Sequence, residues 1–198
     1  MQAVLSTSVR LPQAIVRRLQ STLVIAEHDN TSLKPITLNA LTAAKKLGGD
    51  VSCIVAGSNC GSVGAELSKA ACISKILVAD SEAFVGFLPE RLAQLVTATQ
   101  NKFKFTHIVA CASAQGKSLL PRVAAQLDVS PINDIIEVKA ADTFVRTIYA
   151  GNALMTIKSK DLVKVITVRG TSFDAALVEG GSDAQENVAA VNLPTDLS

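Results

Sequence analysis

Ser113, Gly116, Lys117 and Ser118 are residues whose types and spacing could hold a phosphate group. They follow a short apolar run and precede a segment whose apolar residues recur with a helical period. A strand, a glycine-containing loop and a helix can cradle phosphate, because the free N–H groups of the first helical turn carry a partial positive charge. A P-loop also needs a glycine at the position of Cys111. The sequence therefore argues against a nucleoside triphosphatase and favours an ordinary strand-to-helix turn.

Two other groups of polar residues could do chemistry. His107 could be paired with Ser113 or Ser118, but His107 opens the predicted strand and Ser113 lies beyond its far end, so a structural histidine is the better interpretation. Glu27 and Asp29 flank His28 and could serve a ribose or a metal, although solvated loop charges explain them more simply. We expect no catalytic, cofactor-binding or metal-binding residue in this chain.

The four cysteines form no C-x-x-C pair, and neither of the two histidines stands at ligand spacing from them. Their surroundings are apolar, which is typical of small core residues in a reducing compartment. The cysteines are Cys53, Cys60, Cys72 and Cys111.

Strands and helices are predicted to alternate from residue 22 to residue 127. Short apolar runs of the kind found in buried parallel strands are each followed by an amphipathic segment, and Pro35 and Pro89 suit helix starts. Four such units predict an α/β fold with a parallel sheet and flanking helices. Ligands of such sheets bind beyond the carboxyl ends of the strands, where the strand order reverses. The candidate rim comprises Glu27–Asp29, Gly57–Asn59, Asp80–Glu82 and Ala112–Gly116.

After Pro131 the pattern changes to strands separated by short turns. The runs 134–139, 143–149, 153–158 and 163–168 alternate in polarity and predict an antiparallel layer added to the sheet. Arg146, Lys158 and Arg169 could be ordinary exposed strand positions or a docking surface for another subunit, and the sequence leaves both open. Residues 179–198 are expected to form a linker or tail, not a closing element.

The first 20 residues contain three arginines and no acidic residue, which is typical of a mitochondrial transit peptide. Subtracting their +3 from the overall +2 leaves about −1 for the remainder, so charge indicates neither a nucleic-acid nor a membrane partner. No apolar run is long enough to be a membrane span.

Several segments resemble one family. The runs STLVIAEH, ITLNALTAAKKLGGDVSCIVAG, THIVACASAQGKSLLPRVAAQLDVSPINDII, DTFVRTIYAGNALMTIK and VRGTSFDAA are similar to the N-terminal domain of electron transfer flavoprotein alpha subunits. The resemblance covers residues 21–175 and implies an α/β domain like that of adenine-nucleotide alpha-hydrolases. It also implies a location in the mitochondrial matrix.

In function, the resemblance implies an electron carrier and not an enzyme. It implies a heterodimer with the beta subunit that passes electrons from acyl-CoA dehydrogenases of fatty acid beta-oxidation to a membrane quinone oxidoreductase. The FAD of this family is held mainly by a second, C-terminal domain, and we expect this chain to be a truncated subunit that lacks it. Residues 21–178 would then supply a scaffold for docking the beta subunit. The alternative is an adenine-nucleotide-binding domain that uses the loop 112–118.

Overall fold

The computed structural model describes residues 20–178 except Ala71, together with residues 185–187. Residues 1–19 of the predicted transit peptide and most of the predicted tail lie outside the described residues. Within the described part, no helix is both long and apolar enough to cross a membrane.

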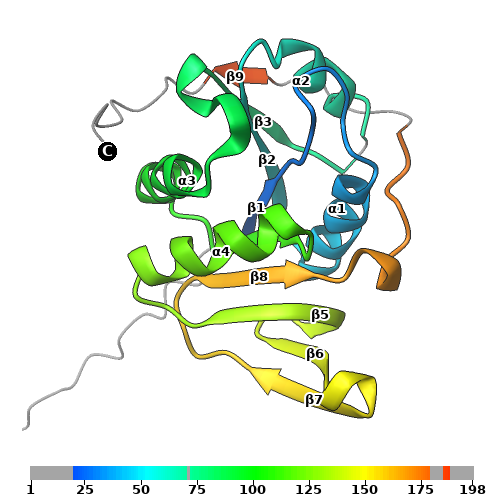
Figure 1. The fold of residues 1–198 in the computed structure, drawn as a ribbon. Coiled ribbons are helices and arrows are strands. Elements are labelled where there is room, and N and C mark those ends of the chain that lie inside the picture. The colour runs from blue at the N-terminus through cyan, green and yellow to red at the C-terminus, as the bar shows by residue number, and fades with distance from the viewer. Residues whose placement is uncertain (1–19, 71, 179–184, 188–198) are drawn as a thin grey trace, which may run out of the picture.

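Residues 21–126 form the alternating units that the sequence predicts (Figure 1). The strands β1, β2, β3 and β4 are mutually parallel, and β1 lies between β4 and β2. The strand order therefore reverses between β1 and β4. The elements are β1 (Ser21–Ile25), α1 (Ile36–Leu47), β2 (Asp50–Gly57), α2 (Gly61–Leu67), β3 (Lys75–Asp80), the 3₁₀ segment η1 (Glu82–Phe87), α3 (Pro89–Phe103), β4 (His107–Cys111) and α4 (Ala114–Gln126).

The second part of the chain extends the same sheet beyond β4. Its elements are β5 (Pro131–Ala140), β6 (Thr143–Ile148), the 3₁₀ turn η2 (Tyr149–Gly151), β7 (Ala153–Lys158), β8 (Lys164–Val168) and η3 (Gly170–Ser172). The predicted antiparallel layer is confirmed for β5, β6 and β7. The prediction is wrong for β8, which pairs parallel with both β4 and β5. Its last four residues are all buried, as expected of a strand inside the sheet.

A short strand, β9 (Gln185–Asn187), lies parallel to β3 and closes that edge. The expectation that residues 179–198 hold no closing element is therefore wrong at these three residues. An edge strand exposes unpaired backbone N–H and C=O groups, and this pairing satisfies some of those of β3 without needing an apolar pattern.

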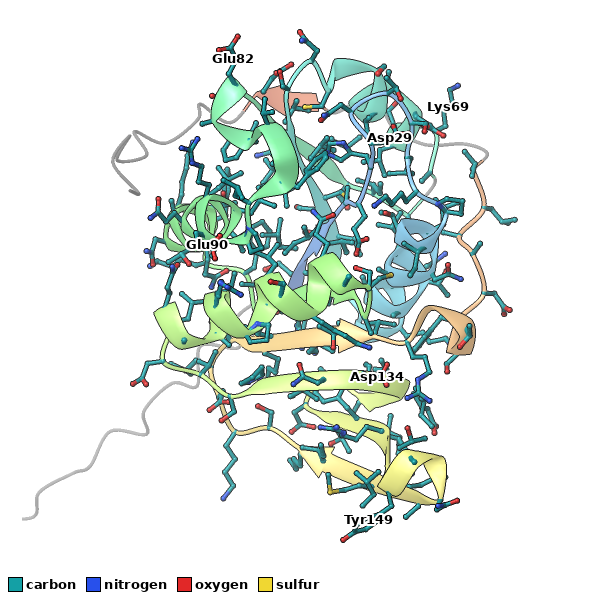
Figure 2. All side chains as sticks on the ribbon, in the orientation of Figure 1. Asp29, Lys69, Glu82, Glu90, Asp134 and Tyr149 are labelled. Atoms are coloured by element: carbon teal, nitrogen blue, oxygen red, sulfur yellow. The ribbon has the colours of Figure 1, made fainter. Side chains whose placement is uncertain are left out.

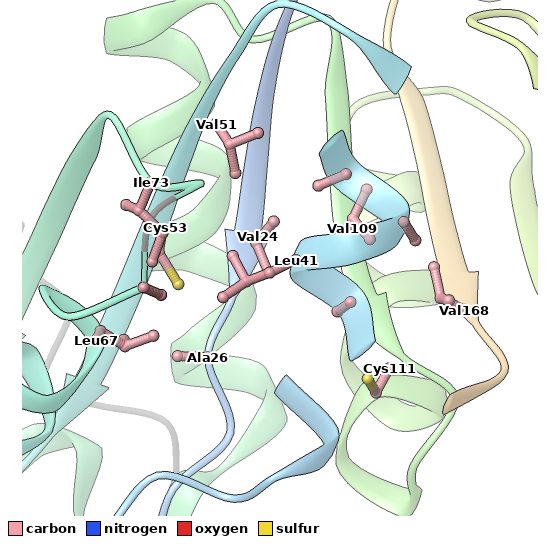
Figure 3. Packing of buried hydrophobic residues seen from close by; sticks show 14 of the residues in the cluster. Val24, Ala26, Leu41, Val51, Cys53, Leu67, Ile73, Val109, Cys111 and Val168 are labelled. Carbon is pink, nitrogen blue, oxygen red and sulfur yellow. The ribbon is translucent and has the colours of Figure 1, made fainter. Parts of the chain in front are cut away.

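Two apolar clusters cover the two faces of the sheet, which explains why the strands are buried on both sides. One cluster lies between the sheet and helices α1 and α2, and includes Val24, Leu41 and Val109 (Figure 3). The other packs the opposite face against α3 and α4. Leu88, which precedes Pro89 at the start of α3, lies outside this cluster and is 48% exposed.

Candidate functional site

The four segments of the predicted rim follow β1, β2, β3 and β4 and meet at one edge of the sheet, as predicted. What the sequence did not indicate is that they bind one another. Gly57 accepts a backbone hydrogen bond from Ser81, and Asp80 accepts one from the backbone N–H of Asn59 through its carboxylate, at 2.9 and 2.8 Å. Hydrogen bonds between these segments therefore hold the rim together.

Glu27 follows β1 at the point where the strand order reverses, which is where ligands of such sheets generally bind. Its carboxylate accepts a 2.6 Å hydrogen bond from the Ser113 hydroxyl, which in turn caps α4 by accepting from the backbone N–H of Gly116 at 3.0 Å. Glu27 is 3% exposed, so the interpretation as a solvated loop charge is wrong for this residue. Burial raises the pKa of its carboxyl, while the hydrogen bond from Ser113 and the charge of Lys34 lower it. A side chain of the protein thus sits beside the first turn of α4.

Gly116 makes this arrangement possible. A Cβ at residue 116 would lie 1.9 Å from the carbonyl oxygen of Cys111, so only glycine lets the first turn of α4 approach the end of β4. Glycine at this position therefore serves helix-to-strand packing here. The same residue in a P-loop would instead serve a phosphate.

The loops after β1 and β2 also close on each other. Asn30 accepts a 3.3 Å hydrogen bond from the backbone of Ser58 through its side chain, and donates its own backbone N–H to the His28 ring. A Cβ at Gly57 would lie 2.2 Å from the Asn30 side-chain oxygen and 2.8 Å from the His28 ring. The carboxylate of Asp29 accepts hydrogen bonds from Thr31 and Ser32, which hold its pKa well below its ordinary range. The charge of Asp29 therefore stabilises the conformation of its own loop.

One small cavity lies at this edge. A cavity of about 10 Å³ lies between the ends of β1 and β2 and the helices α3 and α4, lined by Ala26, Ala56, Gln115 and Leu119 among others. That volume holds about one water molecule. Lys117 lies at the start of α4, exposed, and its charge acts on Asp134 in β5. This cavity is too small for an adenine nucleotide.

His107 is a structural residue, in agreement with the simpler interpretation. It is buried, its Nε2 lies 2.6 Å from the carbonyl oxygen of Ala141, and its Nδ1 lies 2.9 Å from the Thr106 hydroxyl. Burial lowers its pKa, which keeps the ring neutral. The Ser118 hydroxyl accepts a hydrogen bond from Arg122. The contact of His107 with Ala141 therefore holds the start of β4 beside the turn between β5 and β6.

The four cysteines are free thiols, three of them fully buried, as the sequence predicts for core residues. Burial raises the pKa of Cys111 to about 12, and the Cys111 thiol donates a hydrogen bond to the carbonyl of Ile36. Among the described residues, no group of three His, Cys, Asp or Glu side chains could hold a metal ion.

Of the three basic residues proposed on the antiparallel layer, the structure brings two together. Arg169 forms an ion pair with Asp134 and also donates to the hydroxyl of Thr147 at 3.0 Å. Arg146 lies close enough for its charge to act on Asp134 as well. Lys158 lies toward the other end of the hairpin, where it pairs with Asp142 at 3.2 Å. The predicted basic face is therefore a smaller cluster at one end of the layer.

Asp134 organises this cluster, and sequence reasoning missed it. It sits in a bulge of β5 opposite β8, with the left-handed φ of +58°, and its backbone N–H donates to the Thr167 hydroxyl at 2.8 Å. A bulge redirects a side chain out of the regular alternation. The hydrogen bonds and charge of Arg169 lower the pKa of Asp134, and Lys117 and Arg146 act in the same direction. The only available signal was the Asn-Asp pair inside a predicted strand.

The fold, a parallel α/β sheet continued by an antiparallel hairpin layer, agrees with the comparisons to known proteins. Residues 22–195 match the sequence model of the electron transfer flavoprotein domain. Because the match covers most of the chain, the chain belongs to the electron transfer flavoprotein family.

Within that family the chain is similar to alpha subunits. It is 52% identical over 181 residues to the probable mitochondrial alpha subunit of Caenorhabditis elegans, covering 91% of this chain and 54% of that protein. It is 50% identical over 167 residues to the alpha subunit of Pseudomonas aeruginosa, covering 84% and 53%. It is 47% identical over 166 residues to the mitochondrial alpha subunit of Dictyostelium discoideum, covering 81% of this chain and 47% of that protein. The chain spans about half the length of these curated relatives.

Proposed function

We propose that this chain acts as the N-terminal scaffold of an electron transfer flavoprotein alpha subunit, binding the beta subunit through its antiparallel layer. The complex would pass electrons from acyl-CoA dehydrogenases of fatty acid beta-oxidation to a quinone oxidoreductase, without catalysis by this chain. The relatives are named as subunits of a flavoprotein, which supports a partner subunit.

The exposed hairpin carries the docking proposal. Tyr149 is 79% exposed and Leu154 is 68% exposed, although both are apolar and belong to a well-formed hairpin. In the described part of the chain, β7 pairs on one edge with β6 and has its other edge open. An exposed aromatic residue beside an open strand edge is typical of a surface that a partner covers. Figure 2 shows Tyr149 projecting from the far end of this layer.

The described residues do not fit a flavin. The carboxyl edge of the sheet, where this fold would bind a dinucleotide, is closed by the hydrogen bond of Ser113 to Glu27 and by the hydrogen bond of Ser58 to Asn30. We therefore propose that FAD is held mainly by the half of the relatives that this chain does not match. The flavin would supply the electron transfer, and the protein its orientation and electrostatics.

Two further parts of the proposal concern the ends of the described domain. Residues 1–20 would be a transit peptide that directs the chain to the mitochondrial matrix, and two of the three relatives above are named mitochondrial. Residues 21–178 together with strand β9 would be the folded domain, and the remainder of residues 179–198 a linker toward a flavin domain. A reporter carrying residues 1–20 should enter mitochondria, and one with Arg10, Arg17 and Arg18 replaced by alanine should not.

The test of the proposed function is reconstitution with the beta subunit. The purified chain should be colourless alone and should form an equimolar complex with the beta subunit in size-exclusion chromatography. Stoichiometric flavin absorbance on the isolated chain would contradict the scaffold proposal. The absence of any complex would contradict the docking proposal.

A further inference from the structure

At one end of the antiparallel layer, one cation is paired with a carboxylate and two more lie close enough for their charges to act on it. The cations are Lys117 at the start of α4, Arg146 in β6 and Arg169 after β8, and the carboxylate is Asp134. We call these four residues the basic end. One carboxylate cannot neutralise three cations, so the basic end keeps an excess of two positive charges. Figure 2 places Asp134 at the same end of the layer as Tyr149.

Arg169 already uses most of its donors. Its Nε and one terminal nitrogen donate to both oxygens of Asp134, and the same nitrogen donates to Thr147. Asp134 is in turn fixed by the bulge and by its backbone hydrogen bond to Thr167. This pair is therefore a rigid support, with its geometry set by β5, β6 and β8.

Lys117 and Arg146 are different, because among the residues that the structure describes their side chains have no hydrogen-bond or ion-pair partner. The Nε of Arg146 is also enclosed, without a partner for its N–H. A buried donor that bonds nothing costs free energy, and guanidinium groups in proteins normally meet an acceptor. The side chain of Arg146 therefore has a free donor that an anion could bond, and the described residues do not supply that anion.

Apolar residues border the basic end. In the register of β6 and β7, Arg146 lies opposite Met155, and Thr147 lies opposite the exposed Leu154. Tyr149 follows two residues later in the left-handed conformation, with φ of +51°. Arginine, tyrosine and methionine are enriched at the centres of protein interfaces, and an apolar border keeps water away from an ion pair. Small anions need no such border.

We infer that the basic end binds an acidic side chain of the beta subunit, seated between Lys117 and Arg146 and flanked by the apolar hairpin. This inference rests on the proposed function and specifies its docking surface. Complementary charge speeds association and fixes the register of two subunits, so the carboxylate would select the orientation of the complex.

The experiment measures the dissociation constant of the chain for the beta subunit by biolayer interferometry at low and at physiological salt. In the double variant Lys117→Gln/Arg146→Gln we expect binding to weaken about tenfold or more, with a shallower salt dependence. The matched control is Lys139→Gln/Lys160→Gln, which also removes two exposed cations from this layer, away from Asp134. The control should change the dissociation constant by less than about twofold.

Two further variants keep the test decisive. Lys117→Glu alters only an exposed, unpaired side chain and should weaken binding even if Arg146→Gln disturbs folding, which thermal unfolding would reveal. Arg146→Lys, which keeps the charge, should retain more affinity than Arg146→Gln.

The outcomes separate the two proposals. A wild-type chain that forms no complex overturns the proposed function and this inference together. A complex whose dissociation constant is the same in the double variant overturns the inference alone. Self-association of the chain that the double variant abolishes would also overturn it, since the basic end would then bind a second copy.

Discussion

Replacing Ser113 with alanine tests whether the closed rim depends on the contact of Ser113 with Glu27. The substitution removes the N-cap of α4, which costs about 1 kcal/mol. It also leaves the buried Glu27 carboxylate without the hydrogen bond at 2.6 Å, which costs a further 1–3 kcal/mol or so. We expect the free energy of unfolding to fall by about 2–4 kcal/mol in urea denaturation. Ser130→Ala, at an exposed serine in a loop, is the control and should change stability by less than about 0.5 kcal/mol.

The pH dependence has a defined sign. The pKa of Glu27 is raised above its ordinary value of 4.5, so between the two values the folded chain binds more protons than the unfolded chain. Stability from this group therefore declines as the pH rises through that window. Ser113→Ala removes an interaction that lowers this pKa, so its cost should be larger at pH 8 than at pH 4.5.

A double-mutant cycle completes the test. In the Glu27→Gln background, where no charge is left without its hydrogen bond, Ser113→Ala should cost less than in the wild type. If Ser113→Ala costs less than about 0.5 kcal/mol, or the same in both backgrounds and at both pH values, the reasoning about the closed rim is wrong.

Four further predictions follow from contacts described above. Gly57→Ala should destabilise the chain by about 1–3 kcal/mol in urea, because its Cβ would meet Asn30, while Gly61→Ala, with open space around it, should not destabilise it; equal effects would contradict the loop packing. Arg169→Ala should raise the pKa of Asp134 toward 3.8 in an NMR titration, and an unchanged pKa would show that the pair is not formed. Stability should decline as the pH falls below 6.5, because the pKa of the buried His107 is lowered and unfolding takes up a proton; His107→Gln should flatten that decline. In the native chain an Ellman reagent should modify the half-buried Cys72 before the three buried thiols, and rapid reaction of all four would show an open fold.

The alternating units could be predicted because each strand and helix carries its own local pattern. The buried run of β4 and the helical stripe of α4 can each be recognised from residues that are close together in the sequence. The position of β8 could not be predicted in this way. Its sequence fits either a parallel or an antiparallel strand, and its place between β4 and β5 depends on residues more than 20 positions away.

The rim shows the same limit for function. The sequence correctly placed Glu27 and Ser113 at one edge of the sheet, because all parallel strands end there. Whether the edge is open or closed depends on a contact between two residues 86 positions apart, which no local pattern encodes. Asp134 escaped prediction for a related reason, since a bulge breaks the alternation that identifies a strand.

The late position of β8 has a consequence for synthesis of the chain on the ribosome. β4 ends at Cys111, but the strand that lies between it and β5 begins only at Lys164. Until that segment has emerged from the ribosomal exit tunnel, β4 and β5 each present an unsatisfied edge at which another nascent polypeptide could add a strand. A chaperone that shields these edges should therefore raise the yield of chains that are slowed or arrested before residue 168.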